Sequence, residues 1–230
     1  MKSSEKNQCR MTLVLVCGLL ICLASVLLTE MPSLSATVEA LSTEELRELQ
    51  QKMNQRRELS VKFTQTRTSN LRPNKPSKSF GKALFAKPAK FRWEVEKPVA
   101  DVLIFNGSSL LSYKPGEKTA TRFNTEAERA REIKEVIDFV LDFDALMARY
   151  NLIESSHQSQ GISLRLKPKK TSPLSEISIE IDSKSYFVRL VKMTFQNKNT
   201  SEFQFSDPQA PQISPQSFAV PEGLKIVDGV

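Results

Sequence analysis

Apolar and polar residues alternate with a period of two along most of the chain after residue 60. In the segment SVKFTQT (60–66), the side chains of Val61, Phe63 and Gln65 would share one side. Such alternation predicts β-strands with one buried face and one solvated face. The pattern returns at short intervals in SFGKALFA (79–86), FRWEV (91–95), ADVLIF (100–105), SLLSY (109–113), TATRF (119–123), GISLRL (161–166), EISIEI (176–181), YFVRLVKMTF (186–195) and SEFQF (201–205). Hairpin-length spacing of this kind predicts an antiparallel sheet of roughly ten strands.

A loop and a tight turn are predicted between some of these strands. The polar, proline-rich stretch SNLRPNKPSK (69–78) indicates a mobile loop. The Asn106-Gly107 pair predicts a tight type I′ hairpin, in which both central residues have positive φ.

Before residue 60, apolar residues recur at helical spacing instead of alternating. Ser42 is a suitable N-cap residue, and Glu45 three positions later completes a capping-box pattern. A narrow apolar stripe follows at Leu46, Leu49 and Met53, against a charged face. These signals predict an amphipathic helix that begins near residue 42.

A second helical segment is predicted between residues 125 and 150. Thr125 and Glu128 form another capping-box pattern, and the aspartates at 142 and 144 allow a break into two helices. Its apolar face is broad and comprises Ala130, Ile133, Val136, Ile137, Val140, Phe143, Leu146, Met147 and Tyr150. Because a helix with a broad apolar face must bury it, we expect this segment to cover the concave side of the sheet.

The predicted fold class is therefore α+β, with helices packed on a long antiparallel sheet. A sheet of this length curls or closes because the twist of its strands accumulates. Neither a fixed-period repeat nor a second domain boundary is visible, so residues 41–230 are predicted to form one domain.

Residues 1–40 are predicted to be a signal peptide. Lys2, Lys6 and Arg10 precede an uncharged run from Met11 to Leu28, and small residues follow in SLSA and TVEA. This arrangement is typical of a secretory signal. The run also reaches the short end of what spans a bilayer, so an uncleaved membrane anchor is the alternative.

Composition excludes several kinds of chemistry. The three cysteines all lie in residues 1–40, so the exported part has no disulfide, thiol nucleophile or cysteine-bound metal. The one histidine, His157, lies in a polar stretch where no orienting partner is evident. We therefore predict no enzyme activity, no metal and no cofactor. The formal net charge of +7 favours anionic surfaces as partners, and an exported protein is not expected to bind nucleic acid.

The order of these strand motifs resembles that of the LolA family, the periplasmic carriers of outer-membrane lipoproteins. The resemblance covers most of the exported chain. It rests on LSVKFTQT (59–66), GKALFAKPAKFRWEVEKP (81–98), LIFNGSSLLSYKP (103–115), the later meander that ends in YFVRLVKMTFQN (186–197), and FAVPEGLKIVD (218–228).

This resemblance implies a curled, incomplete antiparallel β-barrel with a helical lid over an apolar concavity. The concavity would take the acyl chains of a lipoprotein released by an inner-membrane transporter and pass them to an outer-membrane receptor. The chain would then be a periplasmic monomer that performs no covalent chemistry. Two positions depart from the family pattern. Lys87 replaces an arginine before a proline, and Phe85 replaces a tryptophan, which puts any role of residue 87 in holding the lid in doubt.

Three groups of residues are candidates for this function. The predicted acyl-chain-binding residues are Val61, Phe63, Phe85, Phe91, Trp93, Val95, Val102, Ile104, Leu111, Tyr113, Ile162, Leu164, Ile177 and Ile179. The predicted lid residues are Ile133, Val136, Ile137, Val140, Phe143 and Met147. The predicted contacts to a partner or a lipid headgroup are Lys82, Lys87, Lys90 and Arg92, in a basic region that also holds Lys75 and Lys78.

Other interpretations remain open at this point. Alternating apolar strands also build an ordinary close-packed core, and a run of lysines is often a solvated face. The same scaffold could bind another lipid or a glycolipid, or sense lipoproteins. A membrane-anchored interaction domain with a filled core is the alternative from a different class.

Overall fold

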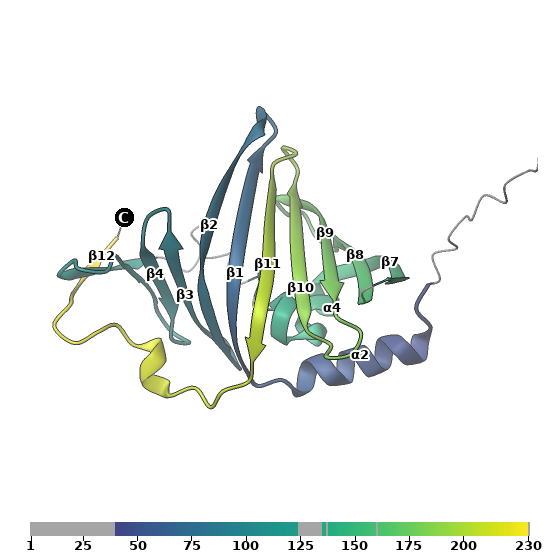
Figure 1. Ribbon diagram of the computed structural model, residues 1–230, viewed down its shortest axis with the longest axis horizontal. Coiled ribbons are helices and arrows are strands. Elements are labelled where there is room, and N and C mark those ends of the chain that lie inside the picture. The colour runs from purple at the N-terminus through teal and green to yellow at the C-terminus, as the bar shows by residue number, and fades with distance from the viewer. Residues whose placement is uncertain (1–39, 124–134, 137, 160, 230) are drawn as a thin grey trace, which may run out of the picture. The chain divides into compact units, whose positions relative to one another are not determined.

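Twelve strands form one sheet in the computed structural model, which describes residues 40–123, 135–136, 138–159 and 161–229 (Figure 1). The strands are β1 (Glu58–Ser69), β2 (Arg72–Ala86), β3 (Lys90–Lys97), β4 (Asp101–Phe105), β5 (Leu110–Tyr113), β6 (Thr119–Phe123), β7 (Tyr150–Gln158), β8 (Gly161–Pro168), β9 (Leu174–Ile181), β10 (Val188–Phe195), β11 (Thr200–Gln209) and β12 (Lys225–Asp228). Their order is β12-β6-β5-β4-β3-β2-β1-β11-β10-β9-β8-β7, so the sheet is open. The prediction of an α+β fold with a long, incomplete antiparallel sheet is confirmed.

Neighbouring strands are antiparallel, with the exception of β12, which runs parallel to β6. The pairing of β1 with β11 joins two segments that lie far apart in the sequence. Ser60 pairs with Gln209 at one end of this ladder, and Thr68 pairs with Thr200 at the other. This ladder occupies the middle of the sheet, between the run of strands from β2 to β6 and the run from β10 back to β7.

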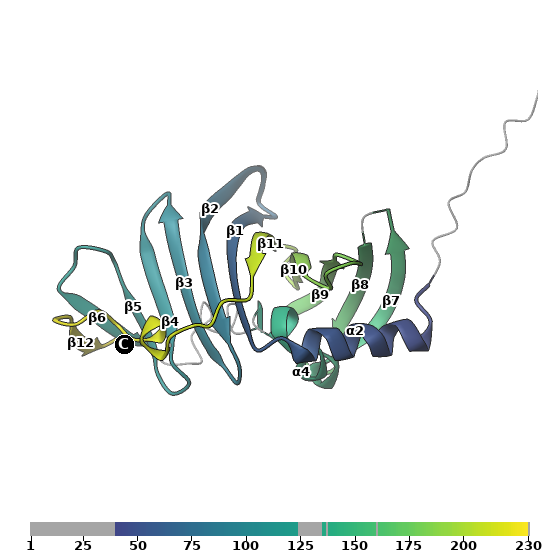
Figure 2. The same cartoon turned by 60° about the horizontal axis from the view of Figure 1, so that its bottom comes forward.

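The N-terminal helix is α2 (Thr43–Gln55). Its predicted capping box is present, because the Ser42 side chain accepts a hydrogen bond from the Glu45 backbone N–H and the Glu45 side chain accepts one from the Ser42 backbone N–H. Leu49 and Met53 are buried, as the apolar stripe predicts. Figure 2 shows α2 on the half of the sheet formed by β7–β10, away from β4–β6.

The second helical segment does break in two. Residues 135–136 and 138–141 are helical, Asp142 is not, and α4 (Phe143–Arg149) follows. The side chain of Asp142 caps α4 by accepting a hydrogen bond from the Ala145 backbone N–H. The predicted capping box at residues 125–128, Ala130, and the predicted lid residues Ile133 and Ile137 lie outside the described residues.

The sheet buries apolar side chains on both faces. We call the face that carries Phe63, Trp93 and Phe203 the inner face, because these residues share one large cluster with side chains from α2, α4 and residues 136–141. Their rings are in close contact: the centroids of Phe63 and Trp93 lie 3.8 Å apart in a stacked arrangement, and Phe203 meets Trp93 edge-on at 5.5 Å.

The opposite, outer face carries a smaller apolar cluster. The C-terminal segment crosses this face through the short helix η1 (Pro215–Phe218) before it joins the sheet as β12 (Figure 2). Phe218 is only 3% exposed and belongs to a cluster with Ala86, Val102, Ile104, Tyr113 and Ala120. The outer face of β4–β6 is therefore covered by the C-terminal segment, although the sequence predicts that this face is exposed to solvent.

The predicted mobile loop at residues 69–78 is wrong. Strand β2 begins at Arg72, and its pairing with β1 continues through Ser77 and Lys78. Strand β3 pairs only with the later part of β2, from Phe80 to Ala86. Prolines 73 and 76 therefore lie where β2 has one neighbour, and a missing N–H is tolerated at such an edge.

The predicted two-residue turn at Asn106-Gly107 is also wrong. The loop comprises residues 106–109, and of the Asn-Gly pair only Gly107 has a positive φ, of 103°. The Asn106 side-chain oxygen accepts hydrogen bonds from the backbone N–H groups of Ser108 and Ser109, at 3.0 and 2.9 Å. The asparagine therefore closes a wider loop through its side chain.

Candidate functional site

A groove of about 550 Å³ opens on the inner face, beside Trp93. We call it the inner-face groove. Its apolar lining is formed by Trp93, Val95, Val99 and Phe123. Most of the remaining lining residues are polar or charged: Gln65, Arg67, Ser79, Asp101, Ser112, Lys114, Glu117 and Thr121. The apolar part includes the exposed side chains of Val99 and Phe123, and we call the polar and charged part of the lining the polar margin.

The polar margin is internally hydrogen-bonded. Gln65, only 7% exposed, donates from Nε2 to the Ser201 hydroxyl at 3.1 Å and accepts from the Ser79 hydroxyl at 3.4 Å. The Ser112 hydroxyl donates to Asp101 at 2.9 Å. Because buried polar groups are costly unless they are paired, these bonds allow polar side chains to border an apolar surface.

Most of the predicted acyl-chain-binding residues lie together on the inner face. They are buried in the large cluster, with Val95 partly buried at its margin: Val61, Phe63, Phe85, Phe91, Trp93, Ile162, Leu164, Ile177 and Ile179. Apart from Trp93 and Val95, they do not line the inner-face groove and are packed in the cluster that also contains side chains of α2, α4 and residues 136–141. A hydrocarbon chain could reach this surface only after the covering helices move.

Four predicted members of this set lie on the outer face instead. Val102 and Ile104 pair with Glu94 and Arg92 of β3, so they face away from Trp93. In β5, Tyr113 pairs with Val102 and Leu111 pairs with Ile104, which places both on the same outer face. The prediction was wrong because β4 is buried on both sides: Leu103 and Phe105 fill its inner face, and the C-terminal segment covers its outer face.

The helices that cover the inner face include the described lid candidates. Val136, Val140 and Phe143 are buried, and Met147 is partly buried against the same cluster. Tyr150 follows this segment, and the centroid of its ring lies 5.7 Å from that of Phe139 in an edge-on arrangement. Burial, together with the nearby Glu135 carboxylate, raises the pKa of Tyr150, so its phenol stays neutral at physiological pH.

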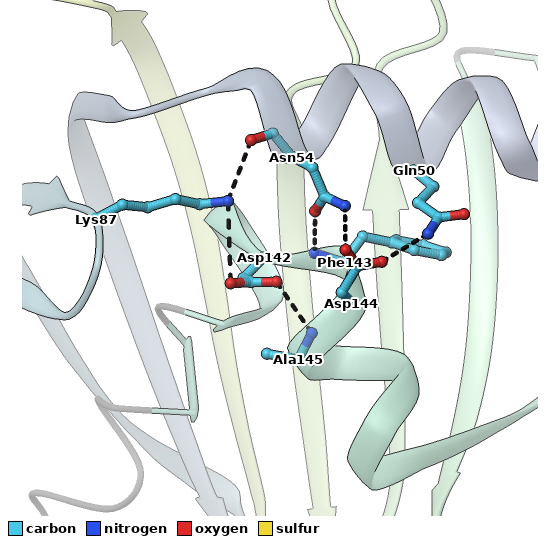
Figure 3. Close-up of polar contacts among 7 residues, drawn as sticks. All are labelled: Gln50, Asn54, Lys87, Asp142, Phe143, Asp144 and Ala145. Atoms are coloured by element: carbon cyan, nitrogen blue, oxygen red, sulfur yellow. Dashed lines mark hydrogen bonds and ion pairs between the residues drawn. The ribbon is translucent and has the colours of Figure 1, made fainter.

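A set of polar contacts joins α2 to the start of α4, and we call it the α2–α4 junction (Figure 3). Asp144 accepts hydrogen bonds from Gln50 at 2.6 Å and from the side-chain nitrogen of Asn54 at 2.8 Å. The Asn54 side-chain oxygen accepts from the Phe143 backbone N–H at 3.0 Å. These contacts hold the first turn of α4, whose N–H groups have no partner within the helix.

Lys87 completes the junction from the end of β2 (Figure 3). Its ammonium group donates to the backbone carbonyl of Asn54 at 3.2 Å and lies 3.9 Å from a carboxylate oxygen of Asp142. The side chain is 17% exposed. Lys87 therefore bridges both helical elements, although as a point charge rather than the planar fork that an arginine would present.

The other predicted basic contacts, Lys82, Lys90 and Arg92, share the outer face of β2 and β3, where two of them are engaged with groups of the protein. Lys82 pairs with Glu96 at 2.9 Å across β2 and β3. Arg92 lies on the outer face, where it bonds to Glu94, to the Tyr113 hydroxyl at 2.8 Å and to the Ser217 carbonyl at 3.3 Å. Lys90 is partly buried at the start of β3. Arg92 thus fastens the C-terminal segment and is not free for a headgroup.

Sequence reasoning did not identify Gln50, Asn54 and Asp144. A signal was present, because Gln50 and Asn54 are four positions apart on α2 and therefore share one helix face. Because both residues are polar, the sequence indicates that this face of α2 is solvated, and only the position of α4 shows otherwise. Among the described residues, no group of three or more His, Cys, Asp and Glu side chains could hold a metal ion, and no helix is long and apolar enough to cross a membrane.

Comparisons with known proteins agree with this architecture. The family described as "Outer membrane lipoprotein carrier protein LolA" matches residues 54–221. Two relatives, each named outer-membrane lipoprotein carrier protein, are similar to this chain: one from Vibrio cholerae is 31% identical over 64% of this chain and 72% of the relative, and one from Chromobacterium violaceum is 26% identical over 74% and 81%.

The crystal structure of an uncharacterized conserved protein from Thermus thermophilus superposes with a TM-score of 0.51 at 8% identity, over 81% of this chain and 98% of the other, which is a likeness of fold alone. The matched family consists of carriers rather than enzymes, and this confirms the prediction that the chain is not an enzyme. Since the family match spans well over half of its length, the chain belongs to the LolA family.

Proposed function

We propose that this protein is a periplasmic carrier that binds the acyl chains of lipoproteins and moves them from the inner to the outer membrane. It would receive its cargo from an inner-membrane lipoprotein-releasing transporter and deliver it to an outer-membrane receptor. Membership of the LolA family supports the carrier role. The observation that carries the proposal is the broad apolar inner face, which lies under helices and opens at the inner-face groove.

Hydrocarbon binding on this face follows from elementary energetics. Removing an acyl chain from water yields about 0.8 kcal/mol for each CH₂ group that becomes buried. A chain that entered beside Trp93 and Val95 would next meet Phe63 and Phe203, once the covering helices had moved. Burial of the acyl chain is most favourable on a surface from which water is excluded. The helices over the inner face exclude water from it until cargo binds.

The α2–α4 junction is proposed to set how readily the cover opens. The bonds of Asn54, Asp144 and Lys87 hold the start of α4 against α2. Each such bond contributes about 1 kcal/mol net, so together they oppose opening by less than one buried acyl chain can provide. These polar bonds therefore do not prevent cargo from displacing the helices, provided that the acyl chain replaces the apolar contacts that Leu49, Met53 and Phe143 make with the inner face.

A loading assay tests the proposal. The purified chain is incubated with inner-membrane vesicles that contain the releasing transporter and an acylated lipoprotein, and soluble complex is measured. Val95→Glu places a charge on the partly buried margin of the inner-face groove. We expect it to lower the yield of complex at least about tenfold, because a buried charge without a partner costs several kcal/mol.

The matched control is Ile153→Glu, which changes a 43% exposed side chain on β7, outside the groove. This variant should load like the parent chain. If the parent chain extracts no lipoprotein, the carrier proposal fails. If Val95→Glu loads at the parent level although it is folded, the inner-face groove is not the route of entry.

A further inference from the structure

Two hairpins end side by side at one end of the sheet. The β1–β2 hairpin turns at Asn70 and Leu71, and the β10–β11 hairpin turns at residues 196–199. The Asn70 backbone N–H donates a hydrogen bond to the Asn199 side-chain oxygen at 2.9 Å, which joins the two tips. Figure 1 shows both tips at the end of the sheet opposite α2.

The groove between these tips is basic. It has a volume of about 540 Å³, and Arg67, Arg72 and Lys75 contribute to its lining. Hydroxyl and amide side chains, including Asn197 and Asn199, make up most of the remainder. Among the described residues that line this hairpin-tip groove there is no aspartate or glutamate. Cations interspersed with uncharged donors favour a ligand that carries phosphate oxygens.

Leu71 is placed at the apex of the first tip. Its side chain is 89% exposed, more than any other large apolar side chain in the part of the chain that the structure describes. Its backbone N–H donates to the Ser69 hydroxyl at 3.3 Å, which holds the turn. An isolated exposed leucine contributes little to the fold, but beside a group of basic residues it has the composition of a peripheral membrane contact.

We propose that the two hairpin tips dock on an anionic membrane surface. Lipid phosphates would occupy the hairpin-tip groove, and the Leu71 side chain would enter the boundary between headgroups and acyl chains. Charge complementarity selects this occupant, because the groove is cationic and the chain carries a formal net charge of +7. Docking by this surface does not require that the protein carry lipoproteins.

The location of the groove gives this docking a geometric consequence. Arg67 lines both the hairpin-tip groove and the inner-face groove. The two grooves are therefore adjacent, at the same end of β1. A membrane held at the tips would face the opening that lies beside Trp93, rather than α2 at the opposite end of the sheet.

Hydrogen–deuterium exchange locates the contact directly. The chain is purified in the form that its host accumulates and is mixed with vesicles of pure phosphatidylcholine or of phosphatidylcholine with phosphatidylglycerol. We expect slower exchange at residues 67–77 and 195–200 with the anionic vesicles alone. This difference reports on the tips whether or not residues 1–40 also touch the bilayer. Equal exchange at the tips with both vesicles would overturn the proposal.

Vesicle binding by variants tests the residues. Reversing two charges with Arg72→Glu and Lys75→Glu should weaken binding to anionic vesicles by at least about 20-fold, since each basic residue near such a surface contributes roughly fivefold. Leu71→Ser should weaken it about tenfold. The matched controls are Lys52→Glu with Lys184→Glu, both exposed near the opposite end of the sheet, and Ile153→Ser.

The controls should bind like the parent chain. If the tip variants bind no more weakly than these controls, the membrane does not dock there. A measurement with inorganic phosphate distinguishes lipid headgroups from free phosphate as the ligand of the hairpin-tip groove. If phosphate alone slows exchange at both tips and the anionic vesicles do not, the groove is a site for free phosphate, and the membrane proposal is wrong.

Discussion

Asn54 makes more contacts between elements than any other single residue of the α2–α4 junction. Its side-chain nitrogen bonds to Asp144, its side-chain oxygen accepts from the Phe143 backbone, and its carbonyl accepts from Lys87. An amide side chain suits this position because it donates and accepts at once. A carboxylate or an amine of similar size could make only one of the two side-chain bonds.

Asn54→Ala should therefore lower the free energy of unfolding by about 1–3 kcal/mol, because the Phe143 N–H and one Asp144 oxygen lose their partners. Urea unfolding measures the change, and exchange of the α4 amides should become faster. The control is Gln51→Ala, an exposed position on the same helix, which should change the free energy of unfolding by less than about 0.5 kcal/mol. Equal losses in the two variants would show that the junction does not hold α4.

At the scale of elements, the strands with one wet face were the most predictable. The alternation in β1, β8 and β9 agrees with their burial, and the capping box of α2 is present as its sequence predicts. These features depend on neighbours in the sequence or on a single buried face.

Elements covered from both sides were not predictable in the same way. The apolar run Val102–Phe105 of β4 is buried on both faces, so its pattern carries no information about which residues face the helices. The cover on the outer face comes from η1, more than a hundred residues later in the chain. The start of β2 was missed because its prolines indicate a loop. They are tolerated in a strand only because β3 is too short to pair with this part of β2.

The capping box of α2 also predicts a dependence on pH. Hydrogen bonds from the Ser42 backbone N–H and hydroxyl, at 2.8 and 2.7 Å, lower the pKa of Glu45, with a smaller contribution from His157. A lowered pKa in the folded state stabilises the fold above the unfolded pKa, and this stabilisation is lost as the pH falls through the folded value. Glu45→Ala should therefore be less stable than the parent at pH 7, and the gap should narrow below about pH 4.

Urea unfolding at a series of pH values measures this gap. Glu222→Ala, which removes an exposed carboxylate near the C-terminus, serves as the control and should show little difference from the parent chain at either pH. A gap for Glu45→Ala that stays constant from pH 7 to below pH 4 would mean that the ionised carboxylate contributes nothing to the start of α2.

At the scale of the whole described region, the sheet separates two apolar clusters. The larger one, on the inner face, contains the residues proposed to bind acyl chains, and the smaller one, on the outer face, fastens the C-terminal segment. Changes on the outer face should therefore affect stability without altering the surface that meets cargo.

Phe218→Ala tests this separation. We expect it to lower the free energy of unfolding by about 3–5 kcal/mol, because a fully buried phenyl ring is lost. Loading with lipoprotein, measured on the folded fraction, should stay within about twofold of the parent. Phe80→Ala, at a 43% exposed position of β2, should cost less than about 1 kcal/mol. A loss of loading with Phe218→Ala at unchanged stability would show that the two faces are coupled.

The β1–β11 ladder determines when the fold can be completed during synthesis. The chain leaves the ribosome from its N-terminus, and Ser60 of β1 is made about 150 residues before Gln209 of β11, with which it pairs. Until β11 emerges, one long edge of the β1–β2 hairpin is open and its inner aromatic side chains lack Phe203. Because pairing between such distant segments is slow, the sheet stays incomplete at its centre until almost all of the chain has been translated.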